Sequence, residues 1–250
     1  MSIKFSFSNN LFKLEKLNLP TRFYYFKEFE NYIKLLNIGE GFFPGDKIFT
    51  NITLDNSSLV LSNESATKIY PSNNNMFAKN FFSINLRNSN FEFINDEFIL
   101  FKNSKFIQFS NLSFDDLSTF FYCDLLSSGR SFENNDFETL CIKNKFSYFE
   151  KLEYFEKFCI NGNQIKDYFA RHKTPNHLIA KVFIRTKNNQ LFEEFLVSNE
   201  IKSFGYSHNS KIMILIFSNT KMDSLKKDIL SIWEFYRSFH SKKSFNLGKQ

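Results

Sequence analysis

The feature of this sequence that most constrains its fold is a weak internal repeat of paired, alternating segments. Apolar residues at every second position, the pattern of a half-buried strand, occur at 52–54 and 59–61, at 84–86 and 91–93, and at 112–114 and 120–122. A polar turn joins the two segments of each pair, and the pairs recur after 32 and then 28 residues. This spacing predicts the stacked β-units of a solenoid; a β-sandwich of ordinary hairpins is the alternative.

The flanking segments extend the mainly β pattern. Strands are expected near Phe5 and Phe12 at an edge, and at 22–25, 32–36, 149–158, 180–185 and 211–217, with a hairpin turn at 161–163 and a turn at 188–189. We expect one domain over 1–250, in which 39–140 forms the solenoid-like core and 141–250 a closing α+β part.

The last part of the chain predicts an amphipathic helix over 221–240. Its apolar residues are spaced by three and four: Leu225, Ile229, Ile232, Tyr236 and Phe239. Asn219 or Thr220 is expected to cap its start. The apolar face docks either on the core or on a partner, and residues 241–250 are expected to fray.

Composition leaves several function classes open. The net charge of +6 reflects either compositional bias or a partner-facing field, and a basic, aromatic-rich chain raises the alternative of nucleic-acid binding. Cys123, Cys141 and Cys159 suit neither a disulfide framework nor a metal knuckle, so we expect reduced, buried thiols and a cytoplasmic protein. No apolar run reaches the length of a membrane span.

The usual signatures of catalysis are absent from the sequence. There is no GxxxxGK[ST] loop, no GxSxG elbow and no HExxH pair. His172 and His177, five residues apart, are only a weak metal signal. A solenoid enzyme acting on polysaccharide would need carboxylates clustered at equivalent repeat positions, and the repeat has none. We therefore expect a protein that is not an enzyme and that holds no tightly bound cofactor or metal.

Three polar clusters resemble a known family. They are EGFFPGD at 40–46, SATKIY at 65–70 and DLLSSGR at 124–130. In this order and at these distances, together with the strand pattern over 48–137 and the ending around Trp233, they resemble the UreD family of urease accessory proteins. Gly41, Gly45, Ala66, Tyr70, Asp124, Gly129 and Arg130 match the family's motif positions.

The resemblance implies a β-solenoid-like scaffold that takes part in nickel insertion into apo-urease. It implies binding to UreF, through UreF to the GTPase UreG, and to urease itself, with no nucleic-acid or membrane partner. It also implies a passage for transient nickel lined by Asp46, Thr67, Lys68 and Glu64. Lone oxygen ligands would suit ion transit, because tight Cys/His sites trap the ion.

Four of the motif residues also have a purely structural interpretation. Asp46 would close a turn by accepting backbone N–H bonds, and Lys68 would form a buried ion pair with Glu64 or Asp46. Arg130 would anchor the turn after Gly129, and Tyr70 would pack in the core with its hydroxyl bonded.

Overall fold

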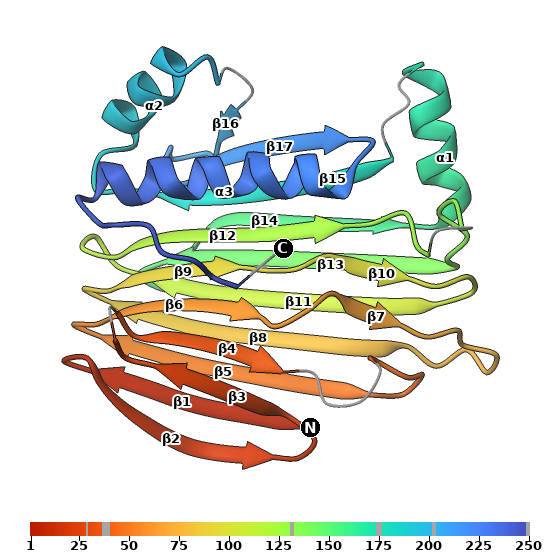
Figure 1. The fold of residues 1–250 in the computed structure, drawn as a ribbon, viewed down its shortest axis with the longest axis horizontal. Coiled ribbons are helices and arrows are strands. Elements are labelled where there is room, and N and C mark those ends of the chain that lie inside the picture. The colour runs from red at the N-terminus through yellow and green to blue at the C-terminus, as the bar shows by residue number, and fades with distance from the viewer. Residues whose placement is uncertain (29, 37–40, 131–132, 174–176, 202–203, 249–250) are drawn as a thin grey trace.

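The computed structural model describes residues 1–28, 30–36, 41–130, 133–173, 177–201 and 204–248, and in this part the chain forms two β-sheets and three helices (Figure 1). The strands are β1 Ser2–Ser8, β2 Leu11–Asn18, β3 Arg22–Phe26, β4 Tyr32–Leu36, β5 Lys47–Asp55, β6 Ser58–Asn63, β7 Thr67–Ile69, β8 Ala78–Arg87, β9 Asn90–Ile94, β10 Phe98–Leu100, β11 Lys105–Phe114, β12 Thr119–Leu126, β13 Thr139–Tyr148, β14 Lys151–Ile160, β15 Leu178–Arg185, β16 Phe204–Tyr206 and β17 Met213–Asn219. The helices are α1 Gly162–Arg171, α2 Asn189–Ser198 and α3 Met222–Phe239.

The internal repeat is the register of a solenoid-like stack, as predicted. Ile84 of β8 pairs in parallel with Ile52 of β5 on one side and with Leu112 of β11 on the other. In the facing sheet, Phe91 of β9 pairs in the same way with Leu59 of β6 and Phe120 of β12. The 32- and 28-residue intervals are therefore the lengths of successive coils, and the sandwich of hairpins is excluded because these neighbours are parallel.

The parallel stack continues on both sides of residues 39–140. On the N-terminal side β1 lies parallel to β5 and β4 parallel to β6, and on the C-terminal side β13 lies parallel to β11. Antiparallel hairpin partners complete the first sheet at both edges, β2 on β1 and β14 on β13. The first sheet thus has the order β14-β13-β11-β8-β5-β1-β2, and the second runs from β16 to β3.

The space between the two sheets holds two apolar cores. In the first sheet, β8 and β11 alternate buried and partly exposed positions, so every second side chain points inward. One core contains Ile52, Ile84 and Leu112 with Phe93 and Tyr122 of the facing sheet. The other lies towards the opposite ends of the same strands and contains Ala78, Phe106 and Leu126.

Helix α3 forms as its apolar spacing predicted, and of the two alternatives for its apolar face the structure shows docking on the outer face of the second sheet. Leu225, Ile229, Ile232 and Tyr236 are buried there against β15 and β17, and Figure 1 shows the helix lying in front of these strands. The predicted side-chain cap is wrong, because Lys221 occupies the cap position without a side-chain bond. Asn219 instead accepts from the backbone N–H groups of Thr220 and Lys221.

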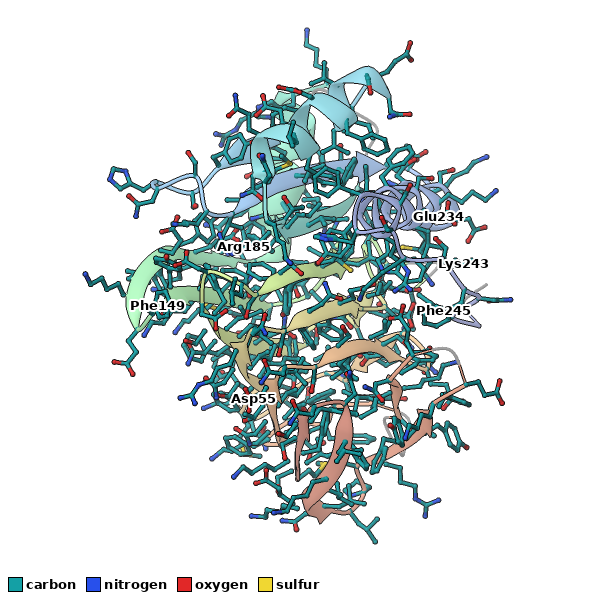
Figure 2. The ribbon with its side chains drawn as sticks, turned by 90° about the vertical axis from the view of Figure 1, so that its left-hand side faces the viewer. Asp55, Phe149, Arg185, Glu234, Lys243 and Phe245 are labelled. Atoms are coloured by element: carbon teal, nitrogen blue, oxygen red, sulfur yellow. A yellow bond between two sulfur atoms is a disulfide. The ribbon has the colours of Figure 1, made fainter. Side chains whose placement is uncertain are left out.

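The chain after α3 packs against the protein over its described residues, up to 248, so the expectation that 241–250 fray was wrong for them. The Lys243 carbonyl accepts two bonds from the Arg237 guanidinium, and Phe245 contacts the rings of Tyr32 and Trp233. Figure 2 shows Lys243 and Phe245 on the same side of the molecule as Glu234 of α3. Leu247 is buried as well. Apolar side chains in this tail hold it in place.

Two expected turns are helix starts. The Asn161 side chain accepts from the Gln164 N–H, and the Gln164 side chain accepts from the Asn161 N–H, so 161–163 opens α1 with a capping box instead of closing a hairpin. Asn188 likewise caps α2 by accepting from the Leu191 N–H. Asparagine is common both in turns and at helix N-caps. The prediction of turns at these two places was therefore wrong, because the asparagines are N-caps.

Two of the three cysteines also differ from expectation. Cys141 and Cys159 lie directly opposite each other on β13 and β14 and are joined by a disulfide, whereas Cys123 is buried and takes no part in a disulfide, as predicted. The reason is the hairpin turn near Phe149, which lies midway between the two cysteines and brings them face to face. A spacing of 18 residues says nothing about a disulfide until the position of that turn is known.

Candidate functional site

The three motif clusters meet at one edge of the stack. The Phe42 N–H donates to the Lys68 carbonyl at 2.8 Å, and Phe42 forms an isolated parallel bridge with Ile69. Gly41 is required here: its φ is +139°, and a Cβ at this position would lie 2.3 Å from the Lys68 carbonyl oxygen. The first cluster is therefore held against the second by backbone contacts that only glycine permits.

Asp46 closes the turn of the first cluster. Its carboxylate accepts the Phe43 N–H at 2.9 Å, and its own N–H donates to the Phe43 carbonyl at 3.0 Å. Gly45, with φ of +90°, lies within this turn. The structural interpretation of Asp46 is thus confirmed, and the half-exposed carboxylate also remains reachable from solvent.

The second cluster separates its polar residues by exposure. Thr67 is buried at the start of β7, while Lys68 and Glu64 are exposed and Ala66 is partly exposed. The expected buried ion pair of Lys68 is wrong, because period-two alternation points its side chain outward between buried Thr67 and Ile69.

The third cluster joins the other two through a stack of rings. Tyr70 stacks on Phe43 with 4.5 Å between centroids and meets the edge of Phe101 at 5.0 Å. The Arg130 guanidinium lies 4.3 Å from the centre of the Phe101 ring. Arg130 also makes a two-point ion pair with Glu133 after Gly129, whose φ is +107°. Arg130 is therefore a turn anchor, as its structural interpretation predicted, and half-buried Tyr70 links the clusters.

Asp124 begins the third motif in sequence but lies inside the stack. It is on β12 with its side chain between the two sheets and is 5% exposed. Its carboxylate accepts from Gln108 at 2.8 Å and from Asn144 at 2.9 Å, both from the facing sheet, with Tyr122 at 3.4 Å. A buried carboxylate is costly unless its oxygens are bonded, and these amides supply the bonds.

The amides around Asp124 continue as a row across the first sheet. Gln108 accepts from the Asn80 side chain on the neighbouring strand at 3.3 Å. One step along, Thr50, Ser110 and Asn144 occupy the next inward positions of β5, β11 and β13, and all are buried. These residues lie between the inward members of the two apolar cores.

The second sheet supplies a matching row. Asn63 follows Leu61 on β6, and its amide donates to Asn95, which follows the end of β9, at 2.5 Å. Asp124 is two residues beyond Tyr122 on β12 and pairs in register with Lys181 of β15. We call the buried residues of both rows the polar belt: Thr50, Asn63, Asn80, Asn95, Gln108, Ser110, Asp124 and Asn144.

The belt ends beside a cavity of about 580 Å³ between the sheets and α1. Its apolar lining includes Ile142, Ile165 and Ile179. Its polar lining includes Asp124, Asn144, Glu156 and Lys181, with Arg171 at the end of α1 and His172 directly after it. The Lys181 ammonium forms an ion pair with Glu156 and lies 4.9 Å from the centre of the Phe158 ring.

Burial governs the electrostatics at this end of the belt. Desolvation raises the pKa of Asp124, while the bonds from Asn144 and Gln108 and the charge of Lys181 act against that rise. Desolvation lowers the pKa of Lys181, and the charge of Asp124 opposes it. Each group therefore supports the charged form of the other.

The belt offers oxygen atoms of amides, hydroxyls and one carboxylate. Each of these ligands by itself binds a divalent cation weakly. Among the described residues, no group of three or more His, Cys, Asp and Glu side chains is placed to hold a metal ion. Such an arrangement suits an ion that moves from one ligand to the next better than one that stays.

Sequence reasoning identified Asp124 as a motif residue but missed the rest of the belt. The signal was present in the repeat: Asn80 and Gln108 are 28 residues apart and Asn63 and Asn95 are 32 apart, the same intervals as the apolar positions. The prediction of the solenoid rests on the apolar members of the repeat alone and does not include the equivalent polar positions.

Among the described residues, no helix is both long enough and apolar enough to cross a membrane.

Known proteins similar to this chain give one consistent result. The family model described as UreD urease accessory protein matches residues 17–247. A urease accessory protein UreD from Aliarcobacter butzleri is 51% identical over 250 residues, covering 100% of both chains. Proteins of the same name from Staphylococcus epidermidis and Staphylococcus saprophyticus are each 27% identical, over 63% and 72% of this chain and 58% and 65% of their own lengths.

Proposed function

This chain belongs to the UreD family of urease accessory proteins, and we propose that it is a non-enzymatic scaffold through which nickel reaches apo-urease. It binds UreF, recruits the GTPase UreG through UreF, and contacts urease in the cytoplasm. Nickel passes through it in transit and is not a resident cofactor.

The polar belt is the observation that carries this proposal. A solenoid interior is normally filled with apolar side chains, yet here a row of buried oxygen and amide groups runs from strand to strand between two apolar cores. Asp124 is the carboxylate of this row. Buried polar groups are costly to keep, which favours a functional reason for them. Weak ligands at successive strands would let a divalent ion advance along the stack.

The four passage residues expected from the resemblance take different places in the proposal. Thr67 is buried at the start of β7, shortly after Asn63 in the chain, and would extend the lining. Asp46, Glu64 and Lys68 are reachable from solvent and would form a mouth where ions first meet the protein.

The test combines complex formation with urease activation. A tagged chain is co-expressed with UreF, UreG and apo-urease, and captured partners, bound nickel and ammonia release are measured. Asp124→Asn keeps the size of the side chain but removes its charge, so capture of UreF should persist while activation falls roughly 10–100-fold, the range seen when residues supporting a metal site are changed.

Asp228→Asn, an exposed change on α3, is the matched control and should activate urease as the wild type does. Failure of the wild-type chain to capture UreF or to support activation would contradict the proposal. Steeply salt-dependent retention of RNA or DNA in place of UreF would favour the nucleic-acid alternative. That alternative draws no support from the many phenylalanines that fill the cores.

A further inference from the structure

The end of the polar belt next to the cavity brings four polar side chains together from four strands. Asp124 of β12 is paired in register with Lys181 of β15, and Asn144 of β13 with Glu156 of β14. The bond from Asn144 to Asp124 joins the two pairs across the sheets at 2.9 Å. The ion pair from Lys181 to Glu156 joins them a second time. The four side chains therefore close a ring with the ammonium as its cation.

The oxygen atoms of this ring are not fully used. Oδ1 of Asn144, a residue that is 0% exposed, accepts no hydrogen bond. The buried Oε2 of Glu156, whose side chain is 13% exposed, accepts none either. Both residues line the cavity. A buried acceptor without a donor costs free energy comparable to a lost hydrogen bond. The unbonded Asn144 oxygen and the carboxylates of Asp124 and Glu156 are an environment that favours a cation with more positive charge than an ammonium.

We propose that Lys181 is a tethered, exchangeable cation, which occupies a divalent-cation station formed by Asp124, Asn144 and Glu156 and leaves it when the metal ion arrives. This inference rests on the proposed function only for the identity of the ion as nickel. The ligands would be carboxylate and amide oxygens, which suit hard or borderline divalent ions.

The surroundings of Lys181 leave room for its ammonium to move when a metal ion displaces it. Its side chain is 21% exposed and lines the cavity, and it rests over the ring of Phe158. A flexible four-carbon chain can carry the ammonium towards solvent while its stem stays on the apolar wall. Displacement leaves the two carboxylates neutralised by the metal, and return of the lysine releases it. Lys181 is thus a positioning residue that keeps the station from trapping its ion.

The first test follows the lysine directly in the wild-type full-length chain. The protein is treated briefly with an amine-acylating reagent, with and without nickel chloride, and acylation of each lysine is quantified by mass spectrometry. Nickel should increase the labelling of Lys181 and leave that of Lys166, whose ion pair with Asp136 lies outside the cavity lining, unchanged. Labelling of Lys181 that stays constant at saturating nickel would overturn the proposal.

The second test measures affinity by calorimetric titration with nickel chloride. Lys181→Met removes the competing charge, so the dissociation constant for nickel should fall by at least about tenfold. The reason is that a positive charge a few ångströms from the metal ion weakens its binding by more than about tenfold. Lys181→Arg keeps the charge and should show no gain. Adding Glu156→Gln to Lys181→Met should cancel the gain.

Lys166→Met is the matched control and should bind nickel as the wild type does. The proposal fails if Lys181→Met binds no more tightly than wild type, or if Lys166→Met gains as much. Urease activation by the wild-type chain, measured in parallel, separates the two proposals. Activation together with unchanged Lys181 labelling would refute the exchange and leave the proposed function standing. Nickel-dependent labelling of Lys181 without urease activation would support the exchange and contradict the proposed function.

Discussion

At the scale of single residues, the carboxylate of Glu92 shows how this fold places charge in its interior. It is 0% exposed and accepts from Trp233 at 2.6 Å, from Arg237 at 2.8 Å and from Lys242 at 3.2 Å. Arg237 is shared with Glu30 on the loop before β4. One carboxylate on β9 thereby fastens α3 and the tail to the second sheet.

Glu92→Gln is predicted to destabilise the protein strongly. The amide can still accept from Trp233, but Arg237 and Lys242 lose a buried counter-charge, which costs roughly 3–5 kcal/mol when one partner of a buried pair is removed. Urea unfolding followed by the fluorescence of the single tryptophan would measure the change. Glu15→Gln, which removes the exposed pair with Lys4, should move the midpoint little. A Glu92→Gln midpoint equal to that of Glu15→Gln would contradict the prediction.

At the scale of elements, the local sequence pattern predicts the strands better than it predicts the turns and helices that connect them. The strand 32–36 has the predicted bounds, and 22–25 falls short of β3 by one residue, because alternation is visible within a few residues. The same Asn-rich chemistry marks turns and helix starts, so α1 and α2 were missed at 161–163 and 188–189. The disulfide and the packed tail depend on contacts between distant segments, which no local pattern contains.

Helix α1 gives a prediction at this scale, because its start rests on one side chain. Asn161→Ala removes both the bond to the Gln164 N–H and the reciprocal geometry of the capping box, and should cost about 1 kcal/mol of unfolding free energy. Denaturant unfolding would measure this loss. Asn163→Ala, at the exposed second residue of the same helix, should be neutral or slightly stabilising. Equal losses for the two variants would show that the cap contributes nothing.

At the scale of the whole molecule, the polar belt divides an interior that could have been one apolar core. Its residues come from both sheets and from coils far apart in sequence, and Asn95 keeps an amide N–H without an acceptor. The repeat predicts where these positions lie, but it does not predict that they are polar for a reason. That follows only when the facing rows are seen to meet at Asp124.

The belt therefore predicts a conflict between stability and function. Replacing both members of the Asn63–Asn95 pair by leucine removes two buried polar groups together. The free energy of unfolding should stay nearly the same or rise by about 1 kcal/mol. The same change interrupts the row of ligands. We expect an unchanged or higher urea midpoint, intact capture of UreF, and urease activation lower by roughly 10–100-fold. Leu61→Ile, one inward position away on β6, controls for repacking and should activate normally. A stable double variant that activates urease as well as wild type would mean that nickel does not pass this part of the belt, and would leave the buried amides as specifiers of strand register alone.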